Sequence, residues 1–266
     1  MRLKLFLLLS LSIFIHCFRP NKFESYFKKS MEGKEGAIVV LDLSSNEEYI
    51  YNLELATIRT TPCSTFKIWN TLIGLETNTI HSEFDSFYVW DGVQREYKDW
   101  NRDLNLEEAF RVSCVPAYQN LARKIGMTKM KSQLEKIQYG DLDLSSGVDE
   151  FWLPRPGKKS IQISPYEQAF LIKKFMNQDL KFSDSSRQVL EKIMLYKTSE
   201  KASLYGKTGS GKDPDGIAER NIGWYVGYIS GQRGRYSFAC LLRGANVSGK
   251  TARDLMEELF IESGYL

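Results

Sequence analysis

A chain of 266 residues with 42% hydrophobic and 26% charged residues has the length and composition of a soluble globular protein, built as one unit or as two interlocked subdomains. Its formal net charge is +3, and removal of residues 1–17, which carry two basic and no acidic residues, leaves 34 basic against 33 acidic residues, or +1. A nearly neutral chain without a basic tract gives no electrostatic argument for nucleic-acid binding.

The pattern of the first seventeen residues indicates a targeting segment. Arg2 and Lys4 precede an apolar run from 5 to 15, which is too short for a membrane span. We therefore expect residues 1–17 to be a secretion signal and the mature protein to work in the periplasm. Cys17 ends the run, as the modified cysteine of a bacterial lipoprotein would, but His16 stands where such signals place a small residue. A lipid anchor on Cys17 and a soluble protein cleaved nearby both remain open.

Hydrophobic periodicity predicts the elements that follow. Helices are expected at 23–31, 64–75, 106–111, 115–125, 129–137, 165–176, 185–195 and 250–262, and strands at 37–43, 48–52, 202–208, 222–229 and 236–242. We divide the chain into an N-terminal segment, 18–35, and one domain, 36–266, with a mostly helical insert from about 77 to 200. This order brings both ends of the chain into one antiparallel sheet, covered by the first and last helices.

The sequence Ser64-Thr65-Phe66-Lys67 places a hydroxyl and an amine one helical turn apart on the same face. Serine needs a base within hydrogen-bond reach to act as a nucleophile. The chain has two histidines, of which His16 lies in the apolar segment and His81 in a polar run without a nucleophile motif. Lys67 is therefore the better candidate base, although this spacing also arises by chance in amphipathic helices.

A second motif is Lys207-Thr208-Gly209. The segment 206–212 is similar to a phosphate-binding loop, but Asp213 stands where such a loop needs Ser or Thr, and no helix pattern follows. We expect instead that these residues lie on or just after an edge strand that borders a cleft, with Thr208 and Ser210 on one face and Lys207 on the other. The alternative is a solvated basic edge strand that prevents aggregation.

Six motifs follow one another along the chain: Pro62-Cys63-Ser64-Thr65-Phe66-Lys67-Ile68, Ser113-Cys114-Val115, Tyr139-Gly140, Phe151-Trp152-Leu153, Lys207-Thr208-Gly209 and Gly223-Trp224-Tyr225-Val226-Gly227. In this order they resemble the class D (oxacillinase-type) β-lactamases of the penicillin-recognising serine enzyme superfamily. The resemblance covers the chain after about Gly36. It departs at Asp141, where the family usually has asparagine, and at Cys114, which fills the variable position of Ser-x-Val.

The resemblance implies a transpeptidase-like α+β sandwich, with an antiparallel five-stranded sheet flanked by helices, an all-helical subdomain and the active site between them. It implies that Ser64 attacks a β-lactam amide to form an acyl-enzyme, whose hydrolysis gives antibiotic resistance. Lys67 would be carboxylated on its side-chain nitrogen by carbon dioxide and would act as general base for Ser64 and for the deacylating water. Only a neutral amine can react in this way, and an apolar pocket lowers the pKa of a lysine.

The same resemblance implies further roles. Ser113 would bridge Lys67 and Lys207 and relay a proton to the departing nitrogen, although a lone serine is more often a helix cap. The backbone N–H groups of Ser64 and Ser210 would hold the oxyanion. Four residues would line the lysine pocket: Phe66, Val115, Trp152 and Leu153. The Trp152 indole would donate a hydrogen bond to the modified lysine, and the alternative is that Trp152 only packs in the core.

Thr208 and Gly209 would bind the substrate, and an arginine would anchor its carboxylate. Arginine matches a carboxylate with two parallel hydrogen bonds. Arg253 opens the terminal helix, where the family carries its anchoring arginine, and Arg243, at the end of the preceding strand, is the rival candidate.

The expected small molecules are β-lactam substrates and the carbon dioxide or bicarbonate that modifies Lys67, with no bound cofactor or metal, since two histidines argue against a zinc lactamase. The protein would be a monomer or a homodimer. Alternative functions are a non-hydrolytic β-lactam sensor domain, which stays acylated, and a D-Ala-D-Ala peptidase. Cys63, Cys114 and Cys240 allow at most one disulfide after Cys17 is set aside, and free buried cysteines are expected.

Overall fold

The computed structural model describes residues 22–155, 157–213 and 220–266. The expected signal segment, with Cys17, lies outside these residues and stays a prediction. The described chain contains a six-stranded antiparallel sheet in the order β2-β1-β8-β7-β6-β5. Its strands are β1 (Glu35–Asp42), β2 (Glu48–Tyr51), β5 (Leu195–Thr198), β6 (Ala202–Lys212), β7 (Asn221–Gly231) and β8 (Gly234–Gly244). Strands from both ends of the chain thus meet in one sheet, as the sequence predicts.

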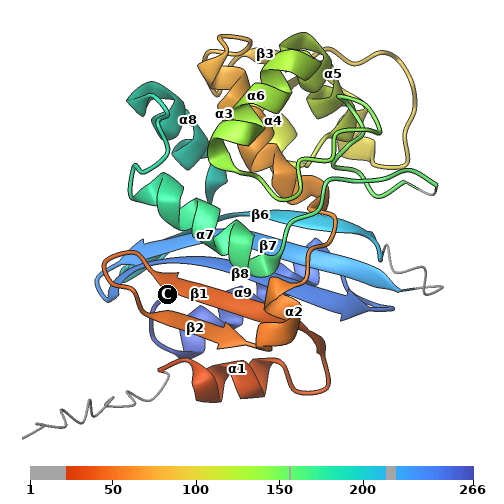
Figure 1. Cartoon of the computed structure of the whole chain (residues 1–266). Coiled ribbons are helices and arrows are strands. Elements are labelled where there is room, and N and C mark those ends of the chain that lie inside the picture. The colour runs from red at the N-terminus through yellow and green to blue at the C-terminus, as the bar shows by residue number, and fades with distance from the viewer. Residues whose placement is uncertain (1–21, 156, 214–219) are drawn as a thin grey trace, which may run out of the picture.

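The sheet separates two groups of helices (Figure 1). On one side lie α1 (Glu24–Ser30) and α9 (Gly249–Glu262), and on the other α7 (Pro165–Met176) packs on β1 and β8. Beyond α7 lie α3 (Lys67–Glu76), α4 (Leu106–Arg111), α5 (Val115–Ile125), α6 (Met127–Ile137) and α8 (Asp184–Met194), with the two-stranded sheet of β3 (Ser86–Tyr88) and β4 (Leu104–Asn105). Short helical segments are α2 (Leu53–Thr57), η1 (Cys63–Phe66) and η2 (Lys98–Trp100).

Side-chain alternation along the strands fills two hydrophobic cores. In β1, Ala37, Val39 and Leu41 pack on the α7 side, whereas Ile38 and Val40 pack toward α1 and α9. A strand buried on both faces reads as a continuous apolar run, which is why residues 37–43 gave a clear strand signal. The core on the α7 side continues without a break into α3, α4, α5 and α6.

The predicted fold class is confirmed, and the helices at 106–111, 115–125 and 165–176 begin and end at the predicted residues. The number of strands is corrected from five to six. The additional strand, β5, begins at Leu195, where the sequence predicted the end of a helix, and all four of its residues are exposed. Without a buried face it has no alternating pattern to reveal it. The helix α7, inside the range 77–200, covers the sheet directly.

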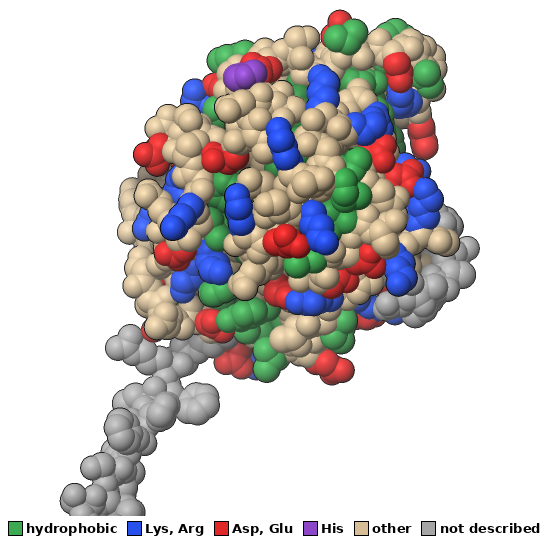
Figure 2. All heavy atoms as spheres, turned by 45° about the horizontal axis from the view of Figure 1, so that its top comes forward, with side chains coloured by type: hydrophobic (Ala, Val, Ile, Leu, Met, Phe, Trp, Pro, Cys, Tyr) green, Lys and Arg blue, Asp and Glu red, His purple; other side chains and the backbone are tan. Residues whose placement is uncertain are grey.

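Within the described ranges, no helix is both long and apolar enough to cross a membrane. On the face drawn in Figure 2, basic and acidic side chains are interspersed rather than gathered by sign. This distribution agrees with the near balance of charges in the sequence.

Candidate active site

Ser64 and Lys67 meet at a change of helix type. Pro62 precedes the 3₁₀ turn Cys63–Phe66, which continues into α3 at Lys67. The Lys67 Nζ donates a hydrogen bond to the Ser64 Oγ at 2.8 Å. The spacing of three residues therefore brings nucleophile and candidate base into direct contact, as predicted from the sequence.

The environment of Lys67 favours its neutral form. The side chain is fully buried, and its Nζ lies 5.4 Å from the centroid of the Tyr118 ring. Burial first, and then the nearby positive charge of Lys207, lower the pKa of Lys67 well below its ordinary value of 10.5. A neutral amine can accept the proton that Ser64 must lose, and it can also react with carbon dioxide.

Ser113 lies in the connection between α4 and α5, with a left-handed φ of 57°. Its Oγ is buried and has no hydrogen-bond partner among the described residues. The Lys207 Nζ donates instead to the carbonyl oxygen of Thr208 at 3.2 Å and to its hydroxyl at 3.4 Å. The hydrogen bonds expected between Ser113 and the two lysines are therefore not formed in this structure, although Ser113 lines the cavity described below.

Lys207 is a second buried lysine. Its Nζ lies 5.5 Å from the centroid of the Phe110 ring, and burial lowers its pKa to about 7. A lysine with this pKa exchanges a proton readily at neutral pH.

The strand β6 carries Lys207 and its neighbours on opposite faces, as alternation predicts. Lys207 points toward Phe110 of α4, whereas the Ser210 Oγ accepts a hydrogen bond of 2.8 Å from the Gly249 N–H at the start of α9. Residues 206–212 form a continuous strand, so the phosphate-loop alternative fails. At Gly209 a Cβ would lie 3.1 Å from the Pro62 carbonyl oxygen and the Thr65 nitrogen, and this close approach seats β6 against the turn that holds Ser64.

The tryptophan of β7 also holds the turn that carries Ser64. The Trp224 Nε1 donates to the carbonyl oxygen of Thr61 at 2.9 Å, three residues before Ser64. At Gly223 a Cβ would lie 2.2 Å from the Ser248 carbonyl oxygen, so only glycine fits there. The Gly223–Trp224 pair thus positions both the nucleophile turn and the start of α9.

Trp152 lies in the core beside the nucleophile turn. It is fully buried and stacks on Phe66, with ring centroids 5.4 Å apart and planes inclined by 25°. Its Nε1 is buried and has no acceptor among the described residues. An N–H group in this state is costly for folding and is available to a ligand or a modified side chain.

Part of the predicted set lines a cavity of about 490 Å³, whereas Lys67, Lys207 and Trp152 do not line it. Its lining includes Ser64, Ser113, Val115, Leu153 and the segment 208–210. Tyr97, Trp100 and Arg155 also line it, and no motif in the sequence had indicated them. The Tyr97 and Trp100 rings lie 4.6 Å apart and form an aromatic wall.

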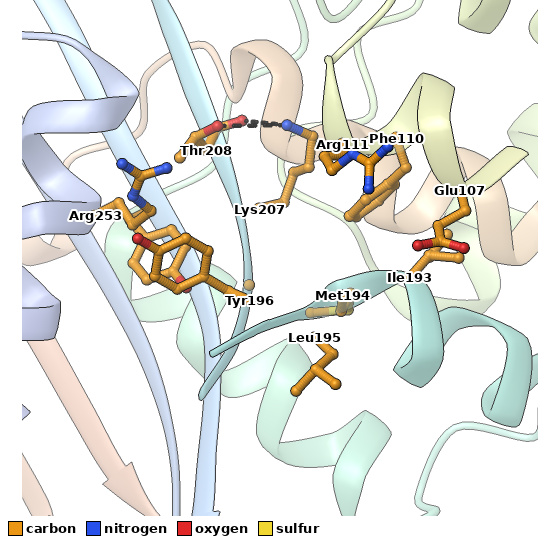
Figure 3. A pocket seen from close by; sticks show the side chains of 12 residues that line it. Glu107, Phe110, Arg111, Ile193, Met194, Leu195, Tyr196, Lys207, Thr208 and Arg253 are labelled. Atoms are coloured by element: carbon orange, nitrogen blue, oxygen red, sulfur yellow. Dashed lines mark hydrogen bonds between the residues drawn. The ribbon is translucent and has the colours of Figure 1, made fainter. Parts of the chain in front are cut away.

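A second cavity of about 470 Å³ adjoins the first at Thr208 (Figure 3). Arg253 and Arg111 lie on opposite sides of Lys207 in this cavity. The Arg253 guanidinium lies 4.7 Å from the Tyr196 ring and donates to Asp254. It therefore faces the cavity from the α9 side, next to Thr208.

The rival Arg243 is placed differently. It is buried, and its guanidinium lies 3.8 Å from the Asp213 carboxylate, which also pairs with Arg220 at 3.0 Å. Arg243 lines neither cavity described above. The geometry therefore favours Arg253 as the arginine that can meet a ligand.

The structure shows what Asp141 does at the position where the family usually has asparagine. The Asp141 Oδ1 accepts hydrogen bonds from the backbone N–H groups of Gln162, at 3.0 Å, and Asp143, at 3.1 Å. An asparagine has the same acceptor oxygen, so aspartate can hold this loop in the same way.

The three described cysteines are free and buried. Burial raises the pKa of the Cys63 thiol to about 12 and also raises that of Cys114. Both thiols stay protonated at neutral pH, so neither competes with Ser64 as a nucleophile. Among the residues that the structure describes, no group of three or more His, Cys, Asp and Glu side chains could hold a metal ion.

Known proteins resemble the chain over most of its length. The model of the penicillin binding protein transpeptidase domain matches residues 19–260. The probable beta-lactamase YbxI of Bacillus subtilis (strain 168) is 35% identical over 232 residues, which cover 87% of this chain and 82% of YbxI.

Two solved structures extend the comparison. A class D beta-lactamase from Bacillus subtilis has a TM-score of 0.81 and 34% identity, covering 90% of this chain and 95% of its own. The C-terminal domain of the Bacillus licheniformis BlaR penicillin-receptor has a TM-score of 0.82 and 30% identity, covering 92% and 95%. The similarity therefore spans both the sheet and the helices that surround the cavity.

Proposed function

The chain belongs to the class D β-lactamases, within the penicillin binding protein transpeptidase family, and we propose that it hydrolyses the β-lactam amide of penicillin-type antibiotics through an acyl-enzyme on Ser64. One observation carries the proposal: the Ser64 hydroxyl is hydrogen-bonded at 2.8 Å to a buried lysine whose pKa is strongly lowered. This contact supplies both requirements of nucleophilic catalysis, a hydroxyl on a residue that lines a cavity and a neutral base beside it.

In the acylation step the Ser64 Oγ forms an ester bond to the lactam carbonyl carbon, and the carbon–nitrogen bond breaks. The Ser64 proton passes to the base at Lys67. The backbone N–H groups of Ser64 and Ser210 stabilise the oxyanion, and the proton taken up at Lys67 passes through the Ser113 hydroxyl to the departing nitrogen. Thr208, Gly209 and Arg253 hold the substrate carboxylate, which lies at the junction of the two cavities.

We also propose that Lys67 is carboxylated by carbon dioxide. Two features of the pocket fit this modification: the amine is kept neutral by burial, and the buried Trp152 N–H has no acceptor among the described residues. The modified lysine would supply an anionic oxygen as general base in both acylation and deacylation. Trp152 would hold that oxygen, while Phe66, Val115 and Leu153 keep bulk water out.

A non-hydrolytic sensor is the second candidate. It is favoured by the match to the BlaR penicillin-receptor domain, whose TM-score of 0.82 is close to the 0.81 of the class D beta-lactamase from Bacillus subtilis. A sensor would take up one equivalent of penicillin and keep it, whereas a hydrolase turns over many equivalents.

Turnover of benzylpenicillin, followed by the intact mass of the protein, separates these candidates. We expect many turnovers per molecule for the wild type in the presence of bicarbonate. Ser64→Ala should lose both hydrolysis and the covalent mass increase, whereas Ser132→Ala, an exposed serine of α6, should keep both. A mass increase retained in Ser64→Ala would refute the nucleophile, and a single equivalent taken up by the wild type would favour the sensor.

We propose that the protein is exported by the segment 1–17 and works in the periplasm, either free or anchored through Cys17. Labelling with a lipid precursor, with Cys17→Ser as control, tests the anchor.

A further inference from the structure

Arg155 introduces a positive charge into the lining of the Ser64 cavity. It is the charged residue among those that line this cavity, in the part of the chain that the structure describes. Its side chain is exposed and forms no ion pair or hydrogen bond with described residues, while its carbonyl oxygen accepts from the Lys158 N–H at 3.1 Å. The guanidinium is therefore free to bind a ligand in the cavity.

A third cavity, of about 640 Å³, continues from Pro154 and Arg155 and reaches Lys212 at the end of β6. Its lining contains four basic residues, Arg155, Lys158, Lys159 and Lys212, against three acidic residues, Asp141, Asp143 and Asp213. Asp213 also pairs with Arg220 at 3.0 Å. Lys212 is exposed and has no acid within ion-pair distance among the described residues. This end of the cleft therefore carries an excess of positive charge.

The three cavities follow one another along the strand β6. Thr208 borders the cavity of Arg253, the segment 208–210 borders the cavity of Ser64, and Lys212 borders the third. A penicillin whose ring carboxylate lies at Arg253 and whose carbonyl lies at Ser64 must direct its acyl side chain away from Arg253. That direction leads along β6 to Leu153 and Arg155.

We infer that Arg155, assisted by Lys212, makes this chain favour penicillins whose acyl side chain carries a second carboxylate. The inference rests on the proposed function for the placement of the substrate. A guanidinium can bind the added carboxylate with two hydrogen bonds, whereas a neutral acyl group gains nothing from it.

The test compares kcat/KM for carbenicillin, which has an α-carboxylate on its acyl side chain, with kcat/KM for benzylpenicillin, which lacks it. We expect the carbenicillin-to-benzylpenicillin ratio to fall about three- to fivefold in Arg155→Ala, the range of an exposed ion pair, and further in Arg155→Glu. High salt should reduce the wild-type ratio toward that of Arg155→Ala. The matched control is Lys136→Ala, which removes the same charge from the exposed face of α6, outside these cavities.

A normal rate with benzylpenicillin and an unchanged ratio in Arg155→Glu would overturn the inference. An equal change of the ratio in Lys136→Ala would assign it to net charge and would overturn it as well. If the protein takes up penicillin without turnover, the hydrolase proposal fails, and the ratio of the two acylation rates, measured by mass, tests Arg155 in the same way.

Discussion

Replacing Trp152 by phenylalanine tests whether the buried indole N–H holds a carboxylated Lys67. The change keeps an aromatic ring to stack on Phe66 and removes the N–H group. A hydrogen bond to a charged group contributes about 1.5–3 kcal/mol. Its loss should weaken the reaction of Lys67 with carbon dioxide by about ten- to a hundredfold.

The assay is benzylpenicillin turnover against bicarbonate concentration, after removal of carbon dioxide by dialysis at low pH. Trp152→Phe should need about ten- to a hundredfold more bicarbonate for half-maximal activity, with activity recovered at saturation. The ¹³C NMR signal of a carbamate formed from labelled bicarbonate should fall in parallel.

Trp69→Phe is the matched control. Trp69 is also buried, and its Nε1 also lacks an acceptor among the described residues, but its ring packs toward Tyr139 at 6.1 Å. It should lose stability, as Trp152→Phe does, and keep the wild-type dependence on bicarbonate. The same bicarbonate dependence in Trp152→Phe and wild type would refute the role of the indole.

Three further changes give distinct outcomes. Burial lowers the pKa of Lys207 from 10.5 in the unfolded chain to about 7 in the folded chain, so the charged lysine destabilises the fold below pH 7. Lys207→Met should therefore raise the melting temperature most below pH 7 and progressively less from pH 7 to 10. A gain in melting temperature that does not depend on pH would contradict this. Arg253→Ala should raise KM for penicillins about ten- to a hundredfold at normal stability. Arg243→Ala, which breaks a buried pair with Asp213, should lower the free energy of unfolding in urea by about 2 kcal/mol with little effect on KM. The reverse result would exchange the roles of the two arginines. Asp141→Asn should leave the free energy of unfolding in urea within error, and Asp141→Ala should lower it by about 1 kcal/mol, because only alanine removes the acceptor. Equal losses would show that the charge matters.

The sequence predicted helices best where their ends carry local signals. The helix α7 begins at Pro165 after Ser164, whose hydroxyl caps the Glu167 N–H while Glu167 bonds back to Ser164. The helix α4 has the same reciprocal cap between Asn105 and Glu108. Such signals lie within four residues, so a single sequence contains all the information that sets these boundaries.

Strands that carry no alternating pattern of their own were missed. The strand β5 lies at the sheet edge with exposed residues, and it is fixed by pairing with β6 rather than by its own pattern. The short strands β3 and β4 pair with each other across a separation of about fifteen residues, which no local periodicity records.

The same distinction holds in the site. The contact between Ser64 and Lys67 is local and follows from their spacing. The aromatic rings next to the two lysines, Tyr118 and Phe110, come from distant helices and carry no motif. For Ser113 the resemblance implied hydrogen bonds with both lysines that the structure does not contain. Long-range geometry of this kind depends on how the helices pack on the sheet.

The region around Ser64 contains several features that each destabilise the folded state. Cys63 and Ser113 adopt left-handed backbone angles, with φ of 50° and 57°, although neither is glycine. Two lysines are buried, and the Ser113 hydroxyl and the Trp152 N–H lack partners among the described residues. Strained residues of this kind cost about 1–3 kcal/mol each and persist only where the surrounding structure enforces them.

These features lie close to one another around Ser64, although single features of the same kinds occur elsewhere, for example at Trp69 and Leu142. The core that surrounds them is continuous from the sheet to α6, and Trp224 and Gly209 fix the nucleophile turn from two sides. A rigid, well-packed core can hold a lysine neutral and a donor unpaired because neither can move to water. The stability of the sheet and the reactivity of Ser64 are therefore coupled: a change that loosens the core should first let water reach Lys67, which raises its pKa and removes the base before the protein unfolds.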